Sequence, residues 1–139
     1  MSLYPVLVFD YKNKPLQELA DNIWQAQKAG HPKILTYCGP LLNATGDSIR
    51  TLNRKQAMRY EAGGAQYRIP LILSRDEYPF ACTVEGGGGS WIGHIPPRQN
   101  SAQGGLLASF IRANGIVPVP GERSKFEVRV INHPGGPVK

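Results

Sequence analysis

The sequence predicts an α+β fold: a small mixed sheet with helices, including a β-hairpin that is followed by a helix. Short runs of β-forming residues alternate with stretches in which apolar residues recur at helical spacing. Glycine and proline separate these segments. The 139 residues, 41% of them hydrophobic, fit one domain, and we expect a core over residues 6–131 and a flexible tail over 132–139.

The first half of the chain is predicted to alternate strands and helices. The expected elements are a strand over Val6–Tyr11, a helix from Pro15 to Ala29, a strand over Lys33–Cys38 and a helix from Asp47 or Ser48 to about Glu61. Arg50 and Arg54 are four residues apart and so share one face of the last helix. That face either binds an anion or is simply solvated.

The second half is predicted to hold the hairpin, a helix and a final strand. The expected elements are a strand over Tyr67–Glu77, a turn over Gly86–Gly89, a strand over Ser90–Ile95 that Pro96 and Pro97 end, a helix over Asn100–Ala113 and a strand over Lys125–Ile131. Pro70 indicates an edge or irregular position for the first of these strands. Gly104 and Gly105 weaken the helix by ~1 kcal/mol each relative to Ala, which leaves room for a ligand or another backbone to approach.

The net charge and the length of the apolar runs indicate which classes of partner the protein can bind. The formal charge of +6 favours polyanions such as nucleic acid. No apolar run approaches the ~20 residues that span a bilayer, and the N-terminus does not resemble a signal peptide, so we expect no membrane partner. Cys38 and Cys82 form either one disulfide or two buried thiols.

A charged cluster, Arg75-Asp76-Glu77, ends the first hairpin strand. One of these acids and Asn100, from the first turn of the following helix, can share a hard cation through oxygen ligands. Side chains alternate along a regular strand, so Asp76 and Glu77 are expected on opposite faces. A structural ion pair is the alternative explanation of the cluster.

The run RDEYPFA (75–81), the EGG turn (85–87) and Asn100-x-x-x-Gly104 together resemble the NucA/NucB-type deoxyribonucleases. The resemblance implies a ββα-metal-like hairpin and helix, and a secreted endonuclease that hydrolyses DNA with a divalent metal, Mg²⁺ or Mn²⁺. Such domains also occur as toxin modules delivered into target cells, which would bring a cognate immunity protein as a partner.

Roles for individual residues follow as hypotheses. Asp76 is the candidate general base, Asn100 and Glu77 the metal ligands, Arg75 the group that neutralises the phosphate, and Arg98, Gln99 and Arg54 the contacts to DNA, while Glu85 and His94 are weaker candidates. Glu85 could simply cap the hairpin, and His94 could replace Asp76 as base. Gln99 and Gln103 could orient water or phosphate, although Gln103 is expected to be solvent-exposed.

Two other functions remain open at this stage. The first is a basic module that binds nucleic acid without cleaving it, and the second is a ribonuclease. A binding module would tolerate Asp76→Ala, whereas a nuclease would lose turnover with it.

Overall fold

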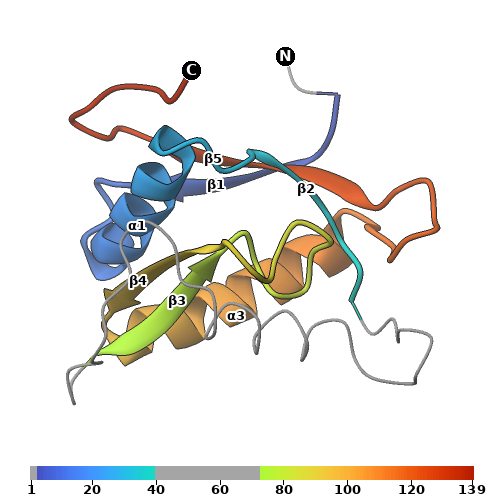
Figure 1. Cartoon of the computed structure of the whole chain (residues 1–139), viewed down its shortest axis with the longest axis horizontal. Helices are drawn as coiled ribbons and strands as arrows, with labels where there is room; N and C mark the ends of the chain where they lie inside the picture. The colour runs from blue at the N-terminus through green and yellow to red at the C-terminus, as the bar shows by residue number, and fades with distance from the viewer. Residues whose placement is uncertain (1–2, 40–72) are drawn as a thin grey trace.

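The computed structural model describes residues 3–39 and 73–139, and within them the fold is α+β, as predicted (Figure 1). The elements are β1 (Val6–Asp10), the 3-10 turn η1 (Lys14–Leu16), α1 (Gln17–Lys28), β2 (Ile34–Thr36), β3 (Ser74–Tyr78), β4 (Trp91–Ile95), α3 (Pro97–Ala113) and β5 (Lys125–Ile131). The predicted helix at 48–61, with Arg50 and Arg54, lies outside the described residues. The same is true of the first part of the strand predicted from Tyr67.

The three-stranded sheet is mixed and has the order β1-β5-β2. The last strand of the chain, β5, lies in the centre, parallel to β1 and antiparallel to β2. Its alternation is as predicted, because Phe126, Val128 and Val130 are all buried in the core. A strand that pairs on both edges and buries every second side chain is a well-anchored centre for a small sheet.

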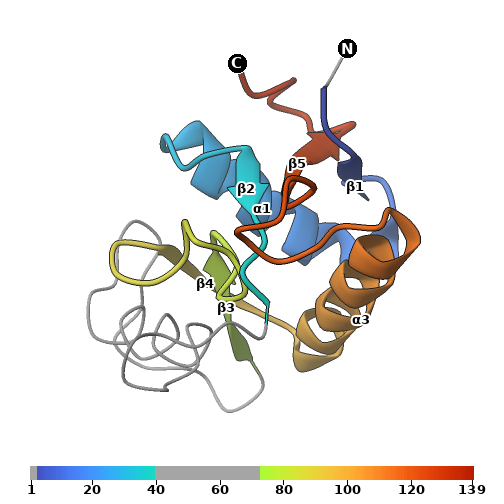
Figure 2. The same ribbon diagram turned by 90° about the vertical axis from the view of Figure 1, so that its right-hand side faces the viewer.

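The helix α1 packs between this sheet and the two-stranded β3–β4 sheet (Figures 1 and 2). Its apolar stripe contains Leu19, Ile23 and Ala26, which are completely buried. The helix also contacts α3. Opposite sides of α1 therefore contact the two sheets, and the same helix also contacts α3.

The helix α3 begins at Pro97, three residues before the predicted start at Asn100. The Pro96 carbonyl accepts hydrogen bonds from the backbone N–H groups of Gln99, at 2.9 Å, and Asn100, at 3.2 Å. Proline suits the first helical position because its missing N–H would have no partner there. The two prolines that end β4 therefore also open α3, and the sequence prediction treated them only as a break.

The C-terminal residues, expected to form a flexible tail, lie against α1. The Trp24 indole Nε1–H donates to the Gly136 carbonyl at 2.8 Å. The His133 ring stacks on the Trp24 ring with 3.9 Å between centroids, and His133 Nε2 lies 2.8 Å from Asp21 Oδ1. None of the described helices is long and apolar enough to cross a membrane.

His133→Ala is expected to lower the free energy of unfolding by about 1 kcal/mol, because it removes a stacked aromatic pair. Urea denaturation measures the difference, with Lys139→Ala, an exposed position, as the control. An unchanged midpoint for His133→Ala would show that the tail contributes nothing to stability.

Candidate active site

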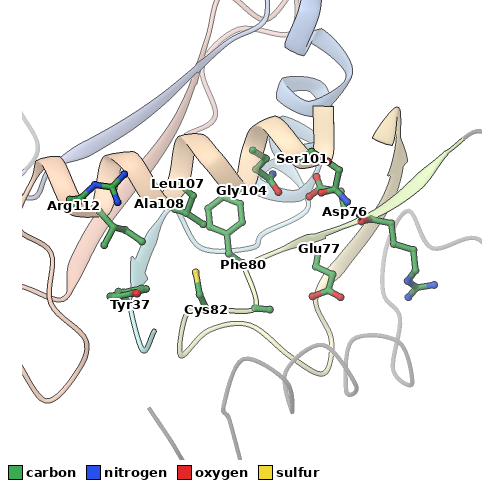
Figure 3. A pocket seen from close by; sticks show the side chains of 15 residues that line it. Tyr37, Asp76, Glu77, Phe80, Cys82, Ser101, Gly104, Leu107, Ala108 and Arg112 are labelled. Carbon is green, nitrogen blue, oxygen red and sulfur yellow. Dashed lines mark hydrogen bonds between the residues drawn. The ribbon is translucent and has the colours of Figure 1, made fainter. Parts of the chain in front are cut away.

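A pocket of about 680 Å³ lies between β3, the segment that follows it, and α3 (Figure 3). It brings together four of the residues predicted for the site: Arg75, Asp76, Glu77 and Asn100. The hairpin brings the three charged residues and α3 brings Asn100, so the site depends on how these two elements pack.

The Asp76 carboxylate is buried, with only 1% of the residue exposed. Its Oδ2 accepts a hydrogen bond from the Asn22 side-chain amide at 2.7 Å. The Asn22 carbonyl oxygen in turn accepts from the Trp91 indole N–H at 2.9 Å. The Asn22 side chain is therefore fixed by Trp91 of β4 through its oxygen, and it fixes the Asp76 carboxylate through its nitrogen.

Gly93 makes this arrangement possible. It pairs with Asp76 across the hairpin. A Cβ atom at Gly93 would come within 1.9 Å of Asn22 Oδ1, which is far closer than non-bonded atoms approach. The glycine is therefore required at this position by the side chain of α1 that crosses it, and not by a turn.

Burial raises the pKa of Asp76 from 3.8 to about 7. The hydrogen bond from Asn22 and the nearby Gln103 amide both lower it, and the Glu77 charge raises it further. The Gln103 amide nitrogen does not reach hydrogen-bond geometry, so Asp76 Oδ1 has no donor among the described residues. One carboxylate oxygen is thus fixed and the other is not, at a pKa suited to proton transfer near neutrality.

The two acids lie on opposite sides of β3, as the alternation predicts. Figure 3 shows Asp76 pointing toward α3 and Glu77 pointing to the other side of the strand, although both line the pocket. Glu77 is half-buried. The two carboxylates are therefore not equivalent, and only Asp76 faces the helix that carries Asn100.

Asn100 is fixed through its amide nitrogen. The Nδ2 group donates to Ser74 Oγ at 2.7 Å and to the Arg75 carbonyl at 2.8 Å. Both amide hydrogens are used on β3, and no described residue donates to the side-chain carbonyl oxygen, which can therefore act as a ligand. Within residues 3–39 and 73–139, no three His, Cys, Asp or Glu side chains gather in a metal-binding group. The described part of the chain therefore offers a cation here only a few ligands, Asn100 among them.

The other predicted site residues lie elsewhere. The side-chain amide of Gln99 joins α3 to α1, because its oxygen accepts from the Leu19 N–H at 2.9 Å and its nitrogen donates to Glu18 Oε2 at 2.6 Å. Both Glu85 oxygens bind Thr36, at 2.7 and 2.8 Å. These side chains hold elements together, and neither of them lines the pocket.

Arg98 is exposed and lies near Glu18, whose pKa it helps to lower, and it does not line the pocket. His94 lies in a separate pocket that Asp21 and Asn22 also line. Arg54 lies outside the described residues. The described part of the predicted DNA-binding set is thus not assembled around Asp76.

A backbone hydrogen bond links Cys38 and Cys82. Both are buried, and the Cys38 N–H donates to the Cys82 carbonyl at 2.8 Å. This contact ties the end of β2 to the segment after β3, and Cys82 lines the pocket.

A sequence model of the family Deoxyribonuclease NucA/NucB matches residues 24–128. The chain belongs to this family. The match covers β2 through most of β5 and includes the whole pocket. No curated protein sequence matches the chain. Membership in the NucA/NucB family makes the protein a nuclease of the deoxyribonuclease class, as the motifs around Asp76 predict.

One residue of this NucA/NucB site, Asn22, was not predicted, and the exposure expected of another, Gln103, was wrong. Asn22 lies just ahead of the matched segment, on the buried stripe of α1 with Leu19 and Ile23. A polar side chain within an apolar stripe is a sequence signal, because a buried amide needs partners. Gln103 was expected at the surface, but it is 7% exposed and lines the pocket beside Asp76.

The raised pKa of Asp76 predicts how stability changes with pH. The folded state binds a proton more tightly than the unfolded state, so wild-type stability falls as pH rises from 4 to 7. Asp76→Asn mimics the protonated acid and removes this loss, which is of the order of 4 kcal/mol.

Urea denaturation in EDTA at several pH values measures the effect. The two proteins should match near pH 4, and Asp76→Asn should be the more stable one at pH 8. Parallel curves across this range would contradict the raised pKa.

Proposed function

We propose that the protein is a divalent-metal-dependent endonuclease that hydrolyses phosphodiester bonds within DNA. The observation that carries the proposal is the Asp76 carboxylate, with Oδ2 held by Asn22 and Oδ1 without a donor among the described residues. Oδ1 is itself buried, so a water would have to reach it from the pocket; a positioned carboxylate oxygen without a hydrogen bond can then take the proton of that attacking water. The family match gives the substrate class.

In this proposal Asp76, Arg75 and Asn22 have different roles in the reaction. A water between Asp76 and the scissile phosphate gives its proton to Oδ1 as its oxygen bonds to phosphorus. The bond from phosphorus to the leaving oxygen breaks, and that oxygen takes a proton from a solvent water to become a hydroxyl group. Arg75 lines the same pocket, where its guanidinium would neutralise charge on the phosphate oxygens. Asn22 keeps the carboxylate oriented and favours its ionised form.

The donor groups fit Mg²⁺ or Mn²⁺, which take oxygen ligands. The Asn100 carbonyl oxygen would be the direct protein ligand, since its amide nitrogen is fixed to β3. Glu77, on the other side of the strand, would act through water. When bound, such an ion withdraws charge from the scissile phosphate. Mg²⁺ commonly keeps several waters, which agrees with the small number of protein ligands.

The NucA/NucB nucleases are secreted, so we infer that this protein acts outside the cell that makes it. A toxin role with an immunity protein stays a prediction from the resemblance.

Plasmid cleavage tests the proposal. Wild type with Mg²⁺ or Mn²⁺ should nick supercoiled DNA, and excess EDTA should abolish nicking. Asp76→Ala should lower the rate by about 10²–10⁴-fold, which is the typical contribution of a general base. Glu122→Ala, which changes an exposed acid, is the matched control and should cleave like wild type.

Each other outcome has a definite meaning. Binding without cleavage by every protein would favour the non-enzymatic module, and cleavage of RNA alone would favour a ribonuclease. Full activity of Asp76→Ala would remove Asp76 from the role of base.

Asn22→Leu tests the support of Asp76. Loss of the amide donor should raise the pKa of Asp76 further, because that hydrogen bond favours the ionised form. The acidic limb of the profile of kcat/KM against pH should therefore move to higher pH, with kcat reduced about tenfold or more. Trp91→Phe leaves the Asn22–Asp76 bond in place and should shift the limb less. A profile unchanged by Asn22→Leu would contradict the role.

A further inference from the structure

The pocket continues well beyond the acidic end. Along α3 it is lined from Asn100 to Arg112, and the opposite wall is formed by Phe80, Cys82 and Tyr37 (Figure 3). At ~1.5 Å per residue, the helix rises ~18 Å between Asn100 and Arg112. One strand of B-DNA rises ~3.4 Å per nucleotide, so the pocket is long enough for several nucleotides.

The middle of this groove is apolar. Phe80 and Leu107 are buried core residues that also line it, and Ala108 and Ile111 extend the same surface along α3. The proposed chemistry at Asp76 needs no such surface. Nucleobases and sugars do, because they pack on aromatic and aliphatic side chains when they are not paired.

The far end carries a positive charge. Arg112 is exposed in the last turn of α3, where its backbone carbonyl accepts from Asn114 and Gly115, and its guanidinium makes no hydrogen bond or ion pair with the described residues. Figure 3 shows it with Tyr37 at the end of the pocket opposite to Asp76. A guanidinium suits the helix C-terminus, and it is also the side chain best shaped to bind a phosphate.

Gly104 makes the wall of the groove flat. Glycine weakens a helix interior, and no packing in the described chain calls for one here, since a Cβ at Gly104 or Gly105 would meet no atom within 4 Å. The two glycines differ in one respect, because Gly104 lines the pocket and Gly105 does not. A backbone without a side chain allows a strand to lie close against α3.

We propose that this groove binds an unpaired segment of a DNA strand. One or more bases lie on the apolar middle beside Gly104, and a phosphate several nucleotides from the scissile bond lies on Arg112. The proposal rests on the nuclease function above and adds to it a preference for single-stranded or locally opened DNA.

The first test compares the two glycines. Binding of a fluorescein-labelled single-stranded 12-mer is followed by anisotropy in EDTA, so that cleavage does not interfere. Gly104→Leu should weaken binding at least tenfold, whereas Gly105→Leu, with the same change on the same helix, should bind like wild type. Circular dichroism confirms that both variants fold.

The second test compares two arginines. Arg112→Ala should reduce the slope of log Kd against log salt concentration by about 0.7, the value for one phosphate contact on a single strand. Arg129→Ala, which removes an exposed arginine on β5 outside the pocket, should leave the slope unchanged. Wild type should also prefer the 12-mer to the same length of fully paired duplex.

The two proposals fail in different ways. Equal binding by wild type, Gly104→Leu and Arg112→Ala would overturn the groove, even if wild type cleaves plasmid. Loss of binding in both variants together with no cleavage by wild type would support the groove and reject the nuclease. A wild type that prefers duplex would overturn the assignment of an unpaired strand.

Discussion

The hydrogen bond between Asn22 and Asp76 is the interaction on which the site depends. A carboxylate removed from water is unfavourable in its charged form, and it is tolerated in a protein when a donor is placed against it. Asn22 provides that donor at 2.7 Å, and Trp91 and Gly93 fix the position of Asn22. The hairpin, α1 and the carboxylate are thus parts of one arrangement.

Other buried polar side chains are also stabilised by hydrogen bonds between elements that are distant in sequence. The Gln27 amide donates both to the Tyr78 hydroxyl, at 3.0 Å, and to the Val128 carbonyl, at 2.9 Å. The Tyr78 hydroxyl donates to the Pro32 carbonyl at 2.7 Å. These buried groups join α1, β3 and β5 at fixed positions, which apolar packing alone would specify less sharply. The shape of the pocket depends on the position of β3, which these hydrogen bonds help to fix.

The sequence predicted what depends on near neighbours along the chain. The alternation of β5, the helical spacing of α1 and the charged cluster on β3 are all local patterns, and each predicted an element of the right type. The bounds differ, because α1 begins at Gln17 after a 3-10 turn and β3 extends over Ser74–Tyr78. Asp76, Arg75, Glu77 and Asn100 share a pocket because the hairpin and helix follow one another directly. Asn22 is 54 residues from Asp76, and no local rule links the two. The partners that hold Gln99 and Glu85, Leu19 and Thr36, are also distant in sequence, so the sequence did not predict that these two side chains join elements together.

The position of β5 has a consequence for when the protein can act. Among the described strands, β1 and β2 each pair with β5 alone, and that pairing has to wait until residues 125–131 have been made. During synthesis the chain already holds Asn22, Asp76 and Asn100, but the sheet against which α1 packs does not yet exist. Such sequence-distant pairing is slow to form. A chain that has not yet reached β5 therefore lacks the central strand of the sheet on which α1 packs, and we expect the pocket around Asp76 to form only after β5 has paired.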